Sequence, residues 1–201
     1  DGTFTAVAAA AESGLEEPTV SLTQPLLTIH DLLERWRALG NLVLPNGTEL
    51  IGRLDDGAWM HVVFPGLKES ALRDLEDRLD RRLPRSVRAF YRCIGGLSLF
   101  SDAFRVHGPA RLGYRLGEQA VQPADLETLV HDIDAFGWLP SGALPFATNS
   151  WDRSVQVVGM GKTPDEIVRC DRATGAVTER HVDVFGCVAA RLQRLDELML
   201  E

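Results

Sequence analysis

Thiols and imidazoles are the side chains of this chain best suited to metal binding or nucleophilic chemistry. Cys170, His181 and Cys187 fall close together along the sequence. Structural zinc sites use four ligands at short, regular intervals, and these three residues match no such spacing and have no evident fourth ligand. The sequence therefore predicts that all three occupy strand or helix positions and hold no metal.

Cys93, just before Gly95-Gly96, is the candidate nucleophile for an enzyme. A cysteine nucleophile needs a base within reach, and His107 or His131 would have to serve, but no feature of the sequence brings either of them close. A buried thiol that packs as a small apolar side chain is the commoner case. We therefore expect no catalytic residue, and a small Cys/His-dependent enzyme is the disfavoured alternative.

The segment His131-Asp132-Ile133-Asp134 alternates carboxylates with other side chains, which suits a metal site, a general acid or a solvent-facing acidic loop. We favour the acidic loop. Carboxylates of this kind would attract a basic protein partner and speed association. The acidic side chains predicted to contact a partner are Asp132, Asp134, Asp152, Asp165 and Glu166.

Large aromatic side chains dominate the binding energy of many protein interfaces. Trp138, Trp151 and Tyr114 are the predicted anchors of this kind. The competing interpretation is that they are core residues, and with four tryptophans in the chain we expect at least two to be buried.

Nucleotides and nucleic acids are disfavoured as ligands. The segment Gly159-Met160-Gly161-Lys162-Thr163 resembles a phosphate loop but lacks its earlier glycine. The net charge of −8 argues against phosphate backbones, which bind clustered Lys and Arg. Residues 67–105 hold nine basic and six acidic side chains, a local +3, whereas residues 106–201 hold nine basic and fourteen acidic, a local −5. A basic protein partner fits the acidic C-terminal half, and no cofactor is expected.

The first part of the chain divides into a lead and an extension. Residues 1–25 lack sustained periodicity and predict a flexible lead. Apolar residues at helical spacing predict a helix over residues 28–39, which Thr28 would cap. A turn-rich stretch predicts a hairpin over residues 42–51, and a short strand is expected at residues 61–64.

Two helices and a set of strands are predicted after residue 62. One helix spans residues 72–79, and a second opens at Pro84 and ends at Gly95-Gly96. A helix near residues 123–130 and short strands at residues 97–100, 104–106 and 114–116 are weaker predictions. Strands at residues 155–158, 166–170 and 176–182 precede a closing helix over residues 185–199, capped by Asp183. This order predicts an α+β fold with a mixed, mostly antiparallel sheet flanked by helices.

Several short segments, taken in order, resemble the SUKH superfamily, which includes a yeast cell-wall-synthesis regulator and many bacterial toxin-immunity proteins. Each segment is common by itself, so the weight of the resemblance lies in their order and spacing. The segments are Pro65-Gly66-Leu67, the helix through Glu76 and Leu79, Leu83 to Tyr91, Ile94-Gly95-Gly96, Val106-His107-Gly108 with Arg111, Pro123 to Leu126, Trp151 to Ser154, and Asp171 to Gly175 with the last helix.

Ile94 departs from the family pattern, because a polar residue usually precedes the glycine pair. The resemblance implies a SUKH-like domain over residues 62–201, with residues 26–61 as a helix-and-hairpin extension without a counterpart. It also implies a binding module, since bacterial members bind and neutralise toxins, often nucleases. A non-catalytic scaffold in a larger assembly, as in the fungal relative, is the alternative function.

The remaining compositional features concern location. The sequence has no run near the roughly 20 apolar residues that cross a bilayer. Its three unevenly spaced cysteines do not resemble the disulfide framework of a small secreted protein. We therefore expect a cytoplasmic protein that does not bind a membrane, and the acidic net charge disfavours nucleic acid. The resemblance implies that the protein is bacterial and that its partner is a cognate polymorphic toxin.

Overall fold

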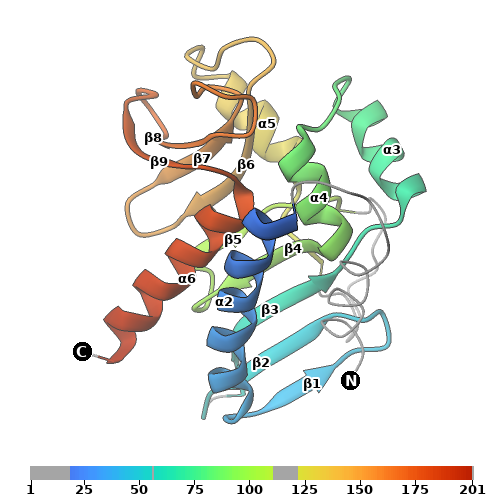
Figure 1. The fold of residues 1–201 in the computed structure, drawn as a ribbon, viewed down its shortest axis with the longest axis vertical. Coiled ribbons are helices and arrows are strands. Elements are labelled where there is room, and N and C mark those ends of the chain that lie inside the picture. Colours follow the sequence, from blue (N-terminus) through green and yellow to red (C-terminus); the bar gives the residue numbers. More distant parts are fainter. Residues whose placement is uncertain (1–18, 56, 111–121, 201) are drawn as a thin grey trace.

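A computed structural model describes residues 19–55, 57–110 and 122–200. Within these described residues, nine strands form one sheet in which chain order and spatial order are the same (Figure 1). All neighbouring strands pair antiparallel. The strands are β1 (Asn41–Val43), β2 (Glu49–Arg53), β3 (Trp59–Pro65), β4 (Ile94–Leu99), β5 (Phe104–Val106), β6 (Leu144–Asn149), β7 (Ser154–Val158), β8 (Ile167–Asp171) and β9 (Val177–His181).

The described residues also form helices on the sheet. They are α2 (Thr19–Arg37), α3 (Glu69–Arg78), α4 (Arg85–Cys93), α5 (Leu126–Asp134) and α6 (Val184–Leu200). Helices α2 and α6 lie side by side across the strands (Figure 1), and the Trp36 indole Nε1 donates to Asp196 Oδ1 at 2.9 Å between them. Each described helix falls short, in length or in apolar character, of what a bilayer crossing requires. The fold is therefore α+β, with a sheet flanked by helices.

Helices α5 and α6 cover opposite faces of the same strands. Gln156 of β7 lies against Cys187 of α6. Its neighbour Val155 pairs with Thr148 of β6, which hydrogen-bonds to His107, and His107 in turn contacts the N-cap of α5. Because successive side chains of a strand point to opposite faces, this half of the sheet is buried on both sides.

The hairpin expected at residues 42–51 is confirmed as β1 and β2, and the expected strand at residues 61–64 lies within β3. The first helix is longer than expected. It begins at Thr19, so residues 19–25, expected in the flexible lead, are helical, and Thr28 lies inside the helix with its hydroxyl donating to Gln24 O at 3.1 Å rather than capping it. The boundary expected at residues 61 and 62 falls inside β3, which joins the first strands to the rest of the sheet.

The glycine pair does not end a helix as expected. Helix α4 ends at Cys93 and β4 begins at once with Ile94, so both glycines lie in a strand. A Cβ atom on Gly95 would lie 2.4 Å from the Pro65 carbonyl oxygen, and one on Gly96 would lie 2.8 Å from Pro123 Cβ. These glycines are required by the close approach of neighbouring backbone and side chains.

Strands β7, β8 and β9 and helix α6 follow the predictions closely. Asp183 caps α6 as expected, with Oδ1 accepting the Gly186 backbone N–H at 2.8 Å. Strand β6 was not expected, because Pro145 and the small Ala147 hide its β pattern. The expected strand at residues 114–116 and the predicted anchor Tyr114 lie outside the described residues.

Candidate functional site

Two hairpin turns lie at the same end of the sheet. Ser154, the first residue of β7, pairs with Asp171, the last residue of β8, so the β6–β7 turn and the β8–β9 turn are neighbours. The end of α5 reaches this place, because Asp132 forms an ion pair with Arg172 at 3.1 Å. We call residues 132–138, 150–153 and 172–176 together the turn surface.

Trp151 is the most exposed tryptophan, with 65% of its surface accessible on the β6–β7 turn. The turn that carries it is fixed. Asp152 Oδ1 accepts the Ser154 backbone N–H at 2.9 Å, which closes an Asx turn, and Arg153 adopts a positive φ of 55°. The indole is therefore an exposed aromatic side chain on a defined backbone, which is the arrangement expected of an interface anchor.

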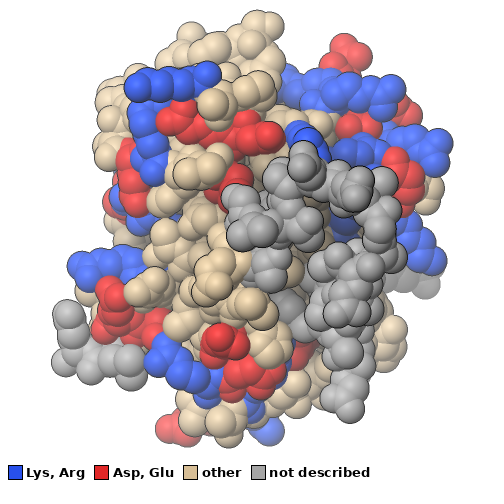
Figure 2. Space-filling model, in the orientation of Figure 1, with Lys and Arg blue, Asp and Glu red and all other residues tan. Residues whose placement is uncertain are grey.

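Two of the three acidic side chains of the turn surface, Asp132 and Asp152, form ion pairs with arginines of this chain. Asp152 forms an ion pair with Arg169, which also pairs with Glu179 at 3.2 Å. Figure 2 shows acidic and basic side chains intermixed over much of the visible face. The charge available to a partner is therefore smaller than the count of carboxylates suggests.

The segment from His131 to Asp134 is the last turn of α5 and not a loop, so this prediction was wrong. The physical reason is a helical pattern of apolar residues, in which Ile133 is fully buried, together with a strong N-cap. Asp125 supplies that cap by accepting the backbone N–H of Glu127 and of Thr128. Asp132 and Asp134 are nevertheless exposed at the helix end.

Trp138 joins the turn surface to the core. Its indole Nε1 donates to the Arg172 carbonyl at 3.0 Å, and its ring lies against Gly175, whose φ is 72°. A Cβ atom at position 175 would overlap the ring, at 2.6 Å from its Cδ2 atom. The expectation that at least two tryptophans are buried was too strong, since Trp36 and Trp138 pack against the core but remain partly exposed.

Asp165 and Glu166 lie at the opposite end of the sheet, in the loop that joins β7 to β8. Asp165 Oδ1 accepts the backbone N–H of Ser86 at 2.9 Å, in the first turn of α4. Glu166 accepts the backbone N–H of Lys162 and pairs with Arg180 at 3.2 Å, and these contacts lower the pKa of its carboxyl. The structure thus does not bring this pair together with the other five predicted contact residues.

The thiols are placed for packing. Burial raises the pKa of Cys93, Cys170 and Cys187, which disfavours the thiolate needed for attack or for metal binding. Cys187 lies against Gln156, whereas Cys170 pairs with Val155, so the two thiols occupy opposite faces of the sheet. Across the ranges that the structure describes, no three His, Cys, Asp or Glu side chains are grouped to hold a metal ion.

His107 is a structural link between strands and α5. Its Nδ1 lies 3.1 Å from the Asp125 carbonyl oxygen and its Nε2 lies 3.1 Å from Thr148 Oγ1, so both ring nitrogens are engaged. Burial lowers the pKa of His107 to about 4. The buried Tyr91 hydroxyl donates to the His107 carbonyl at 2.6 Å and fixes the backbone there.

This histidine predicts a pH dependence of folding. Its pKa is about 4 in the folded protein against an ordinary value of 6.5, so the folded state favours the neutral ring. The stabilisation is fully present above about pH 6.5 and is lost as the pH falls toward about 4, at about 1.4 kcal/mol per pH unit. Urea unfolding between about pH 7 and about pH 5, above the range where carboxylates titrate, measures the summed slope of the buried histidines. Burial also lowers the pKa of His61 and of His181, so the contribution of His107 is the difference between the wild type and a His107 variant. We expect a smaller slope in His107→Asn, and an unchanged slope would contradict the assignment.

Sequence reasoning missed two members of the turn surface. Phe136, just after α5, is 48% exposed, and Arg172 neutralises Asp132 while its carbonyl holds Trp138. Both lie in segments that looked like ordinary connections. An aromatic residue two positions beyond the end of a helix was the available signal for Phe136.

Comparison with known proteins leaves the family of this chain open. No family model matches the sequence, and no curated protein matches it. Among solved structures, the fold is similar to that of a protein from Pseudomonas syringae pv. tomato, with a TM-score of 0.47 and 13% sequence identity. That similarity covers 78% of this chain and 92% of the other.

Proposed function

We propose that this protein is a toxin-immunity protein that binds a cognate bacterial toxin in a stoichiometric complex and occludes its active site. The proposal rests on the resemblance to the SUKH superfamily and on one observation, the Trp151 indole, 65% exposed on a rigid turn. A tryptophan side chain has only two rotatable side-chain bonds, so it loses little conformational freedom when a partner covers it.

The surroundings of Trp151 support a protein partner rather than a small substrate. The described part of the turn surface adds Phe136, Asp132 and Asp134, an apolar side chain and two exposed carboxylates. An apolar centre with a polar rim is the usual composition of a protein interface. The net charge of −8 favours a basic partner such as a nuclease, and we place the encounter in the bacterial cytoplasm.

Co-expression with the product of the adjacent reading frame tests the proposal. We expect that product to be toxic alone, the toxicity to be relieved by this chain, and a complex of fixed stoichiometry to elute from size-exclusion chromatography. A non-toxic neighbour, or a toxic one that neither co-elutes nor is relieved, would overturn the proposal.

A deletion at the N-terminus tests the scaffold alternative, but deleting the first sixty residues would remove too much of the fold. Removing those would delete α2, β1 and β2, and α2 packs against α6. A chain lacking only residues 1–18 keeps every described helix and strand. If that chain relieves toxicity fully, the scaffold role of these residues is not needed for the proposed function.

A further inference from the structure

A groove of about 600 Å³ lies at the far end of the sheet from the turn surface. Its walls come from three segments: the corner between α3 and α4 at residues 82–84, the turn at residues 141–142, and residues 159–164 of the β7–β8 loop. This volume lies within the range of ordinary ligand-binding clefts, and the groove is broadly open to solvent.

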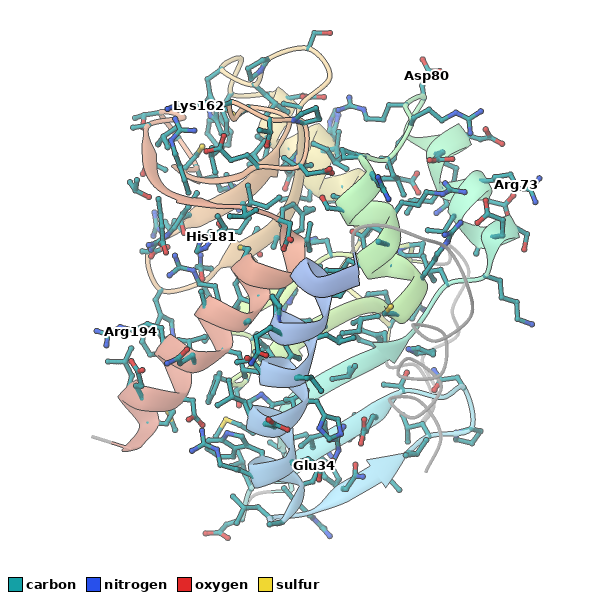
Figure 3. All side chains as sticks on the ribbon, viewed as in Figure 1. Glu34, Arg73, Asp80, Lys162, His181 and Arg194 are labelled. Carbon is teal, nitrogen blue, oxygen red and sulfur yellow. The ribbon has the colours of Figure 1, made fainter. Side chains whose placement is uncertain are left out.

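The charged residues that line the groove are both basic. Arg82 stands on the α3–α4 corner with 84% of its side chain exposed, and Lys162 stands on the β7–β8 loop. Figure 3 shows Lys162 on that outer loop. Ser141 and Thr163 also line the groove, and the described lining includes no carboxylate.

The carboxylates nearest to the groove form hydrogen bonds and ion pairs with residues of its walls. Glu76 is buried, accepts the Leu83 backbone N–H at 3.0 Å, and divides its charge between Arg82 and Arg88. Asp165 and Glu166 accept hydrogen bonds from the backbone N–H groups of Ser86 and Lys162, respectively. Within the described residues Lys162 forms no ion pair, so the groove keeps positive charge in a protein whose net charge is −8.

The walls of the groove are tied together. The Arg81 guanidinium donates to the Ala143 carbonyl at 2.7 Å, which fixes the 141–142 turn against the α3–α4 corner. Gly142 and Gly159 adopt φ values of 86° and 84° and leave the backbone there without side chains. The groove therefore does not need to form when a ligand arrives.

We propose that this groove binds an acidic, extended segment of a partner protein. A compact phosphate fits less well, because the backbone N–H groups of Ser86 and Lys162 that would surround it already donate to carboxylates of this chain. The two cations stand on separate walls, an arrangement that suits carboxylates spaced along a chain. The inference goes beyond the proposed function, since it holds for a toxin or for any other partner.

The test measures binding of fluorescein-labelled hexaglutamate to the full chain by fluorescence anisotropy at low ionic strength. We expect saturable binding that weakens about tenfold in the double variant Arg82→Gln/Lys162→Gln and that weakens further when salt is added. The matched control is Arg73→Gln/Arg194→Gln, which removes the same charge from exposed positions away from the groove (Figure 3). Thermal unfolding checks that both variants fold.

Each outcome decides the proposal. Binding that is lost in the groove variant and kept in the control supports it, whether or not a toxin is ever found. No binding to the wild-type chain, or an equal loss in both variants, overturns it. Stoichiometric displacement of the peptide by inorganic phosphate would show a small-anion site and would also overturn it.

Discussion

Replacing Trp151 with alanine weakens the complex with the partner by an expected 2–4 kcal/mol, which corresponds to about a thirtyfold to about a seven-hundredfold loss of affinity. The indole is 65% exposed in the free protein, so its apolar surface is available for burial by the partner. Isothermal titration calorimetry with an inactive form of the toxin measures the loss, and relief of toxicity in co-expression should fall in parallel.

The stability of the Trp151→Ala chain should be close to that of the wild type, because an exposed turn side chain contributes little to the core. Val182→Ala is the matched control, since Val182 is 78% exposed and lies between β9 and α6, away from the turn surface. We expect binding to be unchanged in this control. An equal loss in both variants, or unaltered affinity in Trp151→Ala, would remove the turn surface from the interface.

Gly96→Ala should destabilise the fold by about 3–4 kcal/mol. Two costs add at this position. The backbone has a φ of 145°, which L side chains rarely adopt, and a Cβ atom would lie 2.8 Å from Pro123 Cβ and 3.1 Å from the Val106 carbonyl oxygen. Urea unfolding measures the change, with the midpoint shifted to lower denaturant and the slope retained.

Gly137→Ala is the control, because it has the cost of a positive φ without the cost of a close contact of the Cβ atom. Gly137 also has a positive φ, of 73°, but a Cβ atom there would meet no heavy atom within 4 Å. We expect a loss of only about 1 kcal/mol, from backbone strain alone. If Gly96→Ala cost no more than this control, the close approach at β4 would not be what requires the glycine.

The close contacts of these glycines involve the same segments that carry the resemblance to the SUKH superfamily. The strongest part of the pattern is Pro65-Gly66-Leu67, the helix through Glu76 and Leu79, Leu83 to Tyr91 and then Ile94-Gly95-Gly96, and Gly108 belongs to a later segment of it. In the structure these glycines converge, since a Cβ atom on Gly66 would lie 2.1 Å from the Arg92 carbonyl oxygen and one on Gly108 would lie 2.0 Å from the Gly95 carbonyl oxygen. The glycines of the pattern therefore lie where β3, β4 and β5 pack closely beside α4, and they reflect a requirement of the fold.

Much of the secondary structure follows from local chemistry that the sequence displays directly. The turn residues Pro45 to Thr48 between two short apolar runs predict the first hairpin, and the spacing of apolar residues together with Asp183 predicts α6. Turns, helix caps and the helical spacing of apolar residues involve residues close together in the sequence. The order of residue types is therefore enough to predict them. The same reasoning misjudged the start of α2, because residues 19–25 lack the sustained apolar periodicity from which the rest of the helix was predicted.

The amino-acid sequence by itself determined the α+β class and most of the helices and strands, and it proposed Trp138, Trp151 and Tyr114 as anchors without deciding which of them are exposed. Only the tertiary structure decided which candidate residues are neighbours. It placed Asp165 and Glu166 at one end of the strands and Trp151 with Asp132 at the other, and it paired Asp152 with an arginine seventeen residues away. Contacts such as the ion pair between Asp132 and Arg172 join residues distant in sequence, and the spacing of residue types along the chain does not encode them.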